Sequence, residues 1–504
     1  MRRVKTNIAA NFAGQTWSIL MGLAFIPIYI RLLGVEQYAL VGFYAILQGL
    51  FTVLDMGLST TLNREIARLS GSAEGLGSAH HLVRTMEVIY WIVAVVIGGG
   101  VVAVSGPVSE IWLSATDLPP EVVQRSVAMM GVLLAVQWPI SLYSGGVMGL
   151  QRQIPLRVVN SVVATMRGVG GTIVLLFVSS TITAYFAWQI FVGLVQVLSL
   201  ALLLWRSLPW PTSKPRFETR LISGFWRFSA GVSGVQIVTI LLTQLPGLLL
   251  SKLLDLEAFG YYTIAQGVAS WLFYLASPIF EAVFPGLSSL SVSGNQTDLK
   301  TLYHWGCQLM SLVVLPLAAI IAVFSPQIML LWTGNATAAA ETQHLVSLLV
   351  VGSALNAAMY LPYGLQLANG WTRLTFLVNT AALAVLGPMV FRLTSEYGAV
   401  GAAYFWLLLN LAYLLVIPNI MHRRVLRGEK RIWYLYDFVL PALAAASIPL
   451  IGRIPANSLP SATGQLIAIS GVAVITYAVT LLTVSRVRAD ALGWLVRLRT
   501  AKVG

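Results

Sequence analysis

Two short stretches, about 220 positions apart, decide the fold of this chain. The first is Leu-Leu-Gly-Val-Glu-Gln-Tyr at residues 32–38, and the second is Leu-Leu-Asp-Leu-Glu-Ala-Phe at residues 253–259. Each copy follows one long apolar segment and precedes another. Further landmarks recur in the same order at a similar distance, namely Gln15 and Gln236, Pro107 and Pro326, Gln137 and Asn356, and Asn160 and Asn379. The pattern predicts a tandem repeat followed by a C-terminal extension.

The composition indicates a protein that lives in lipid. Hydrophobic residues make up 57% of the chain and charged residues only 10%, whereas soluble domains carry roughly 25% charge. The net charge is +13, but the basic residues are scattered singly between apolar segments. They therefore indicate membrane topology, and we expect no nucleic-acid partner. The single cysteine, Cys307, excludes an internal disulfide.

The apolar segments predict an all-α polytopic membrane protein with about fourteen transmembrane helices, because each is long enough to cross roughly 30 Å of hydrocarbon. Spans one to six and seven to twelve form two pseudo-symmetric six-helix bundles, and two C-terminal helices follow. The expected spans are residues 7–33, 38–62, 85–107, 123–148, 158–178, 184–205, 225–250, 259–284, 303–324, 342–363, 373–395, 399–420, 437–452 and 464–485.

The spans define four parts of the chain. Residues 1–205 form an N-terminal six-helix lobe, 206–224 a Pro-containing cytoplasmic linker, 225–420 a C-terminal six-helix lobe, and 421–504 helices 13 and 14 with a basic cytoplasmic tail. Most of the 31 basic residues fall in alternate loops. This asymmetry predicts that both termini lie in the cytoplasm.

Arginines inside or beside the spans are candidates for substrate binding. Arg167 lies near the middle of span five, where a charge costs roughly 2.5 to 3.5 kcal/mol on insertion scales. It either binds substrate or has a structural partner within the membrane. Arg31, Arg125 and Arg392 lie at the outer ends of their spans, where they either bind substrate or extend to the interface.

Uncharged amides within the spans form a second set. Lipid offers an amide no hydrogen-bond partner, so these side chains either join helices or line a polar cleft. A cleft lined by amides and arginines suits a polar or anionic head group. The amides at equivalent repeat positions are Gln15, Gln137, Asn160, Gln236, Asn356 and Asn379.

Two acidic residues are candidates for ion coupling. Asp55 and Glu281 lie near the inner ends of spans two and eight, which are equivalent elements of the two repeats. Each either takes up an ion or is a carboxylate at the membrane interface.

The sequence carries no motif of an enzyme. It has no Gly-rich phosphate loop followed by Lys and no His-Glu-x-x-His, and its five histidines are not at ligand spacing. We therefore expect no catalytic residues, no cofactor and no metal site.

Four short motifs carry a resemblance to a known family. They are Leu33-Gly34-Val35-Glu36-Gln37-Tyr38, Asp55-Met56-Gly57-Leu58, Arg64-Glu65-Ile66-Ala67 and Gly149-Leu150-Gln151-Arg152. With the span count, they make the chain resemble the bacterial polysaccharide transporters. These are the O-antigen flippases of the multidrug, oligosaccharidyl-lipid and polysaccharide exporter superfamily.

The resemblance implies two bundles that alternately open a central cavity to each side of the bacterial inner membrane. The substrate would be a glycan on undecaprenyl diphosphate, moved to the outer leaflet for cell-surface polysaccharide such as the O-antigen of lipopolysaccharide. Arg167, with the three outer arginines, would attract the diphosphate. The resemblance also implies a monomeric transport unit and the polysaccharide polymerase machinery as a partner.

Three alternatives stay open at this point. A lipid II flippase also has fourteen spans. A cation-coupled multidrug antiporter shares the architecture but would use a carboxylate deep in one lobe. A membrane glycosyltransferase or polymerase is less favoured, because it would need catalytic carboxylates and a long loop outside the bilayer.

Overall fold

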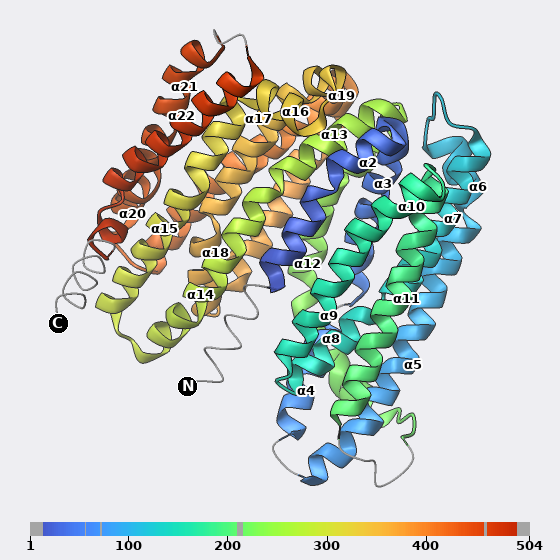
Figure 1. Ribbon diagram of the computed structural model, residues 1–504. Helices are drawn as coiled ribbons and strands as arrows, with labels where there is room; N and C mark the ends of the chain where they lie inside the picture. Colours follow the sequence, from blue (N-terminus) through green and yellow to red (C-terminus); the bar gives the residue numbers. More distant parts are fainter. Residues whose placement is uncertain (1–13, 56, 71–72, 209–214, 458–460, 491–504) are drawn as a thin grey trace, which may run out of the picture. The chain divides into compact units, whose positions relative to one another are not determined.

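The computed structural model confirms the all-α fold (Figure 1). Its only β feature, within the part of the chain that it describes, is an isolated bridge between Ser114 and Asp255. The predicted start of span one and both chain ends lie outside that part. The structure describes residues 14–55, 57–70, 73–208, 215–457 and 461–490.

The chain forms two compact units, residues 1–260 and 261–504. The first unit begins with a helical stretch over residues 14–24. It continues with α2 (Ile26–Leu33), α3 (Val35–Phe51), η1 (Thr52–Asp55), α4 (Leu58–Leu69), α5 (Ala73–Ala103), α6 (Ser105–Pro107), η2 (Val108–Trp112), α7 (Pro120–Gln137), α8 (Pro139–Gly149), α9 (Gln153–Thr165), η3 (Met166–Gly170), α10 (Gly171–Phe177), α11 (Ile182–Ser207) and α12 (Arg220–Leu253).

The second unit starts within α13 and contains the remaining helices. They are α13 (Leu256–Ala269), α14 (Trp271–Ser293), α15 (Gln296–Val323), α16 (Ser325–Thr333), α17 (Ala336–Ala358), α18 (Tyr360–Ala368), α19 (Thr372–Arg424), α20 (Lys430–Ile432), η4 (Trp433–Val439), α21 (Leu440–Asn457) and α22 (Ala462–Thr483).

Thirteen helical segments of the described residues are long and apolar enough to cross a membrane. One of them, α19, has 53 residues and would be about 80 Å long if it were straight. It contains the two predicted spans 373–395 and 399–420. Gly398, with φ 56° and ψ −135°, breaks it between them. Thirteen segments therefore accommodate fourteen crossings.

The break in α19 is a tight reversal of the backbone. A Cβ atom added to Gly401 would lie only 1.9 Å from the carbonyl oxygen of Leu393. Two backbone segments can approach this closely only where one of them lacks a side chain. Gly401 thus permits the hairpin between spans eleven and twelve.

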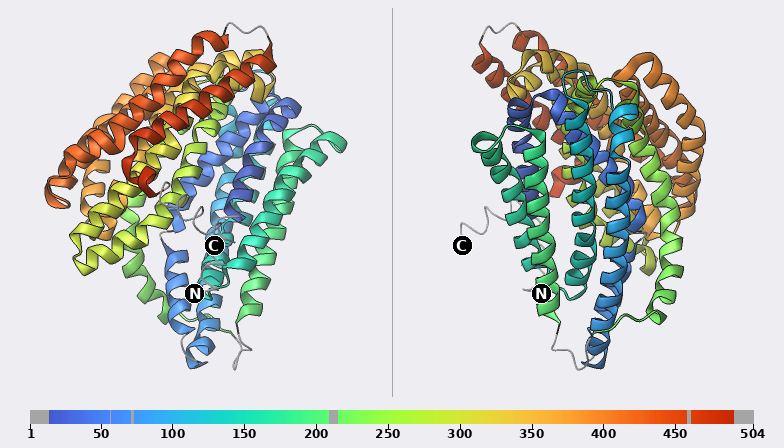
Figure 2. Two further views of the ribbon diagram at one scale, coloured as in Figure 1. Left: turned by 60° about the vertical axis from the view of Figure 1, so that its left-hand side comes forward. Right: turned by 90° about the vertical axis from the view of Figure 1, so that its right-hand side faces the viewer.

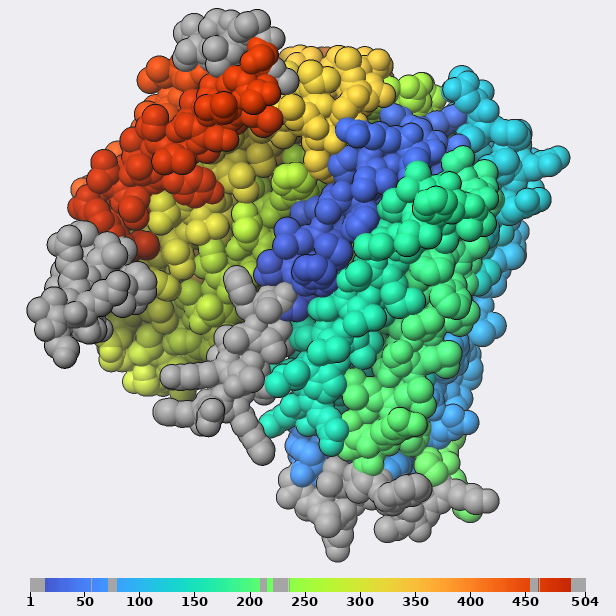
Figure 3. Space-filling view, viewed as in Figure 1, coloured from blue at the N-terminus to red at the C-terminus, as the bar shows by residue number. Residues whose placement is uncertain are grey.

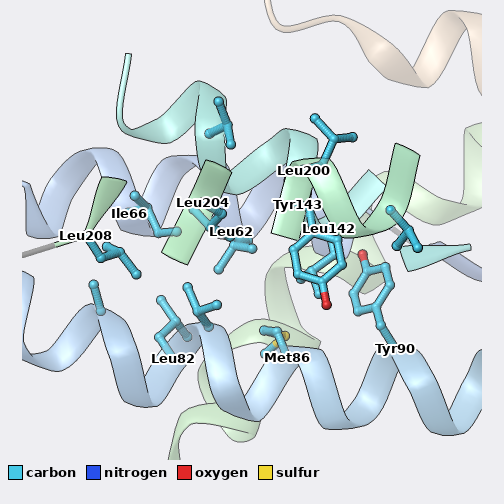
Figure 4. Packing of buried hydrophobic residues seen from close by; sticks show 14 of the residues in the cluster. Leu62, Ile66, Leu82, Met86, Tyr90, Leu142, Tyr143, Leu200, Leu204 and Leu208 are labelled. Carbon is cyan, nitrogen blue, oxygen red and sulfur yellow. The ribbon is translucent and has the colours of Figure 1, made fainter. Parts of the chain in front are cut away.

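The core of the first unit is built where α4, α5, α8 and α11 meet. Leu62 of α4, Met86 of α5, Tyr143 of α8 and Leu204 of α11 are all at most 2% exposed and belong to one cluster (Figure 4). Interdigitated side chains give helices in lipid much of their affinity for one another. This cluster therefore fixes the arrangement of four spans.

Small residues bring α8 against α4. A Cβ atom on Gly145 would lie 2.6 Å from the carbonyl oxygen of Ser59, and one on Gly149 would lie 2.6 Å from that of Asn63. These glycines are one helical turn apart, so they form a continuous contact with α4. Such small-residue contacts are characteristic of helix pairs in membranes.

The first copy of the repeated motif holds two loops in place. Gly34, with φ 80°, separates α2 from α3. The Glu36 carboxylate then accepts hydrogen bonds from the backbone N–H groups of Thr116 at 2.6 Å and Asp117 at 3.1 Å. The neighbouring Gln37 accepts one from the N–H of Ile182 at 2.9 Å. The motif thereby joins the start of span two to the loops before spans four and six.

The second copy acts on its own helix and on the same loop. Asp255 accepts a hydrogen bond from the N–H of Ala258 at 2.7 Å, which caps the start of α13. The N–H of Leu256 bonds to the carbonyl of Ser114 at 2.8 Å, and Trp112 donates to Ser251 at 3.1 Å. The loop after η2 is therefore bound by both copies of the motif.

In the second unit, α21 and α22 lie side by side (Figure 2), and both contact α15. The C-terminal helices, in red, form part of the face drawn in Figure 3. Ile320 of α15 and Phe324, which directly follows this helix, meet Ile469 of α22 in a buried cluster. The C-terminal helix pair is thus a packed part of this unit.

Candidate functional site

Arg167 lies on the π-helical segment η3, which interrupts the α-helix of span five. A π turn leaves some backbone carbonyls without their usual helical partners, and such turns recur at functional sites. Here the Tyr29 hydroxyl donates to the carbonyls of Arg167 at 2.7 Å and Gly168 at 3.1 Å. The indole of Trp188 donates to the carbonyl of Met166 at 2.9 Å. Side chains from α2 and α11 therefore hold the segment in its unusual form.

The guanidinium of Arg167 is positioned by amides. Its Nη2 donates to Oε1 of Gln196 at 2.9 Å, and Nε2 of Gln196 donates to Oδ1 of Asn160 at 3.2 Å. The Nε of Arg167 is buried and has no hydrogen-bond partner among the described residues. No ion pair in the described ranges involves this arginine. Within the described ranges, no carboxylate therefore neutralises the positive charge of this site.

A second group of polar side chains surrounds Gln137. Its Oε1 accepts hydrogen bonds from the Tyr44 hydroxyl at 2.9 Å and from Nε2 of Gln48 at 2.8 Å. Tyr44 also interacts electrostatically with Arg167. These two bonds use both lone pairs of Oε1 of Gln137. The amide nitrogen of the same side chain is a hydrogen-bond donor. We call Arg167, Asn160, Gln196, Gln137, Tyr44 and Gln48 the polar cluster of the first unit.

The other predicted arginines have different surroundings. Arg31 at the end of α2, Arg125 near the start of α7, and Arg392 on α19 are all exposed. Arg392 makes an ion pair with Glu396 at 2.8 Å, one helical turn away. Unlike Arg167, these three arginines therefore lie on the surface of their units.

The remaining predicted amides are distributed over both units. Gln15 is half-buried in the first helical stretch, and Gln236 is exposed on α12. In the second unit, Nδ2 of Asn356 donates to Oδ1 of Asn410 at 2.6 Å, and Asn379 is buried. Asn356 therefore joins α17 to α19, as Gln137 joins α7 to α3.

The two predicted ion-coupling carboxylates differ from each other. Asp55 lies in η1 and accepts hydrogen bonds from three hydroxyls, those of Tyr90 at 2.5 Å, Ser59 at 2.7 Å and Ser141 at 3.2 Å. Glu281 is exposed on α14. Asp55 is thus already a hydrogen-bonding centre between η1, α4, α5 and α8.

Glu87 in α5 forms a buried network for which the sequence gives no signal, because the residue lies at the start of the predicted span 85–107, where a carboxylate can reach water. Its side chain accepts from Tyr143 at 2.6 Å, Trp205 at 3.3 Å and Arg84 at 2.8 Å. Only 8% of the residue is exposed. Gln196 was missed as well, because no equivalent amide repeats in the second half.

Glu65, in the third motif of the resemblance, organises the end of α4. It pairs with Arg68 at 2.8 Å and Arg64 at 3.0 Å. Burial alone would raise the pKa of Glu65, but the hydrogen bonds from Arg68 and Arg64 outweigh burial and hold the pKa below its ordinary value of 4.5. The carboxylate is therefore a stable anion between two cations.

The fold matches known membrane transporters. It is similar to lipid II flippase MurJ in an inward closed conformation, with a TM-score of 0.73 and 12% identity over 97% of this chain and 99% of that one. It is also similar to an inward-facing MATE family multidrug transporter of the MOP superfamily, with a TM-score of 0.65 and 14% identity over 82% and 96% of the two chains. This is the fold class of polytopic transporters.

A family profile described as "Polysaccharide biosynthesis protein" matches residues 4–291, and the chain belongs to this family. A putative O-antigen transporter of Shigella flexneri is 22% identical over 233 residues, which are 46% of this chain and 54% of that protein. The match thus spans about half the length of this curated relative. The resemblance to the polysaccharide transporters is thereby confirmed.

Proposed function

We propose that the protein is a flippase. It moves a polyprenyl-diphosphate-linked oligosaccharide from the cytoplasmic to the outer leaflet of the inner membrane, by alternating access, for cell-surface polysaccharide synthesis. The family assignment and the O-antigen transporter relative support this substrate class. Under this proposal the moving parts are the predicted lobes 1–205 and 225–420, linked by residues 206–224. Residues 421–504 add helices 13 and 14 and a basic tail, and both termini lie on the cytoplasmic side.

The unneutralised charge of Arg167 carries the proposal. A diphosphate that crosses hydrocarbon alone would lose its hydration without compensation, which is prohibitively costly. The guanidinium donates one bond to Gln196, and its buried Nε has no partner among the described residues. Arginine N–H groups bind phosphate oxygens strongly because both partners are charged. Arg167 therefore offers the diphosphate what water would otherwise supply.

The amides and hydroxyls around Arg167 suit a sugar. Gln137, Asn160 and Gln196 carry amide donors and acceptors. Lipid would leave these groups without hydrogen-bond partners. These groups match the hydroxyls of an oligosaccharide, while the polyprenyl chain remains in lipid. Further proposed contacts with the substrate are Gln15, Gln236, Asn356, Asn379, Arg31, Arg125 and Arg392. Asp55 and Glu281 remain proposed ion-coupling residues.

Lipid II flipping is the second candidate, because the fold is similar to that of MurJ over nearly the full length of both chains. A lipid II flippase would also need to move a polyprenyl diphosphate, so Arg167 would serve it equally. A multidrug antiporter remains a third candidate, because the fold is also similar to that of a MATE family transporter. An unneutralised arginine repels cationic drugs, which disfavours that function.

The test is the leaflet distribution of undecaprenyl-diphosphate glycans in depleted cells, measured with a lectin or enzyme that acts only from outside. Cytoplasmic accumulation identifies the substrate from the glycan that accumulates, whether O-antigen unit or lipid II. Arg167→Ala should fail to restore export at normal protein level. Arg206→Ala, which removes an exposed arginine in the last turn of α11, should restore it.

Two outcomes would contradict the proposal. Full export with Arg167→Ala would remove this residue from the mechanism. A normal glycan distribution with increased sensitivity to cationic drugs would instead favour the antiporter.

A further inference from the structure

In the second unit, the imidazole of His304 on α15 lies between two carboxylates. Its Nδ1 contacts Oδ2 of Asp437, which belongs to η4. Its Nε2 lies 3.3 Å from Oε2 of Glu429, in the turn before α20. The side chains of His304 and Asp437 are both 0% exposed, and that of Glu429 is 13% exposed. A fully buried histidine thus contacts Asp437 through Nδ1, while its Nε2 faces the Glu429 carboxylate without a hydrogen-bond partner among the described residues.

This geometry favours a second proton on the imidazole. A neutral imidazole has one N–H donor and one nitrogen lone pair, so with both carboxylates ionised one of its nitrogens would face an anionic oxygen with no proton between them. An imidazolium has two N–H donors, so Nδ1 can donate to Asp437 while the proton on Nε2 faces the charge of Glu429. The arrangement therefore suits an imidazolium between two ionised carboxylates.

The charges around His304 lead to the same conclusion. Lys300 on α15 pairs with Glu429 at 2.8 Å, so the second carboxylate, Asp437, is left for His304. With the proton bound, two cations balance two carboxylates. Without it, the buried Asp437 lacks a cation in contact, and an uncompensated buried charge is strongly destabilising. The other titratable or charged groups that face the cluster are Tyr303 and Cys307 on α15, His422 on α19, Lys430 on α20, Tyr434 on η4 and Arg486 after α22.

The same residues fasten the C-terminal helix pair to α15. Nε2 of Gln308 donates to Oδ1 of Asp437 at 3.0 Å, and its Oε1 accepts from the N–H of Arg486 at 2.9 Å. The Ser311 hydroxyl donates to the Asp437 backbone carbonyl. Three successive turns of α15, at His304, Gln308 and Ser311, therefore contact η4, and Gln308 also contacts the segment after α22. A change of charge at Asp437 would act on all of these contacts.

We propose that His304 is a proton-binding site whose occupancy holds α21 and α22 against α15. The proton comes from water by way of Glu429, the partly exposed carboxylate, and binds Nε2. Loss of the proton exposes the charge of Asp437 to a dry environment and loosens the contacts of η4 with α15. This site is independent of the substrate proposed above, because none of its residues belongs to the polar cluster of the first unit.

The first experiment is solid-state NMR of the full-length protein in lipid nanodiscs with ¹³C,¹⁵N-labelled histidine at pH 7. Wild type should show an imidazolium signal that is missing in His304→Gln and retained in His344→Gln, which removes an exposed histidine of α17. Asp437→Asn should convert the same signal to that of neutral imidazole. A neutral His304 in wild type, or an imidazolium that persists in Asp437→Asn, would overturn the proposal.

The second experiment measures docking of the helix pair, with the buried Cys307 as reporter. Cys307 lies one turn beyond His304, and it is the chain's only cysteine. At pH 7, His304→Gln should increase its labelling by a membrane-permeant maleimide by about tenfold or more, because Asp437 loses its cation and the contact opens more often.

His304→Gln alone leaves Asp437 without its cation, so a paired variant is needed. His304→Gln/Asp437→Asn removes both charges and should label at nearly the wild-type rate. Equal labelling of wild type and His304→Gln would show that the proton does not hold the helices. Fast labelling of the paired variant would show that charge balance is not the cause.

Discussion

The hydroxyl of Tyr29 donates a 2.7 Å hydrogen bond to the backbone carbonyl oxygen of Arg167. This bond joins span one to the π-helical segment of span five and so orients the arginine through its backbone. The side chain of Arg167 is then aligned separately by Gln196. The position of Arg167 thus depends on two uncharged side chains, Tyr29 of α2 and Gln196 of α11.

Removing the Tyr29 hydroxyl should weaken both stability and transport. Tyr29→Phe leaves two buried carbonyl acceptors with one partner fewer, which should lower the free energy of unfolding by about 1–3 kcal/mol. Glycan export should fall while the protein still accumulates. Unfolding in SDS titrations and export in depleted cells check this, with Tyr38→Phe on the buried face of α3 as control. Equal effects of both substitutions would contradict a specific role of Tyr29.

Introducing a carboxylate beside Arg167 should stop transport. Gln196→Glu would place an anion 2.9 Å from the guanidinium, and this anion would compete with the diphosphate. Gln196→Met, which has a similar length and no charge, should retain more export. The leaflet assay compares the two at matched protein level. Better export by the glutamate variant would indicate that the positive charge is not the binding determinant.

Glu36 should be a stability determinant rather than a transport residue. Glu36→Ala removes the acceptor for the N–H groups of Thr116 and Asp117, at a cost of about 1–3 kcal/mol in unfolding free energy. Glu36→Gln keeps one oxygen and should be milder. Glu110→Ala, on the exposed side of η2, is the control and should leave the melting temperature unchanged.

The reversal in α19 should tolerate no side chain at Gly401. In Gly401→Ala the new Cβ would collide with the carbonyl of Leu393, so the hairpin must open and the protein should fail to accumulate. Gly387→Ala in the same helix meets nothing closer than 3.7 Å and should accumulate normally. Quantitative immunoblots of membranes decide between these outcomes. Normal levels of Gly401→Ala would show that spans eleven and twelve can separate without loss.

The pairing of Glu65 should appear in the acid dependence of stability. Its pKa in the folded protein lies below its ordinary value of 4.5, so its contribution is present above that value and is lost as the pH falls through the folded pKa. Between pH 5 and pH 3 the melting temperature of wild type should therefore fall more than that of Glu65→Gln. Parallel curves would show that the two arginines do not stabilise the anion.

Much of the fold could be predicted from the sequence, because a membrane imposes long apolar helices. The fourteen spans follow from hydropathy alone, including the two inside α19 that Gly398 separates. The repeated motif could be found, but the roles of Glu36 and Asp255 could not. Glu36 bonds to a loop some 80 residues away, whereas Asp255 bonds to its own helix. Such partners are set by three-dimensional packing.

The candidate site was predicted in part. Arg167, Asn160 and Gln137 stand out because a polar side chain in lipid needs an explanation, and the structure places all three in one unit. Their partners Gln196 and Tyr44 carry no such signal. His304 and Asp437 carry no such signal either, because each lies at the start of a predicted span, 303–324 or 437–452. A polar stripe at His304, Gln308 and Ser311, at helical spacing, is the signal that could have located their contact.

The π turn at residues 166–170 also determines which way span five faces. One additional residue in a turn rotates everything beyond it by about 100° about the helix axis. The second half of the span, α10, therefore presents a different side to its neighbours from the one that an unbroken α-helix would present. Deleting a single residue from this turn would leave composition and hydropathy almost untouched, yet would redirect the whole second half of the helix.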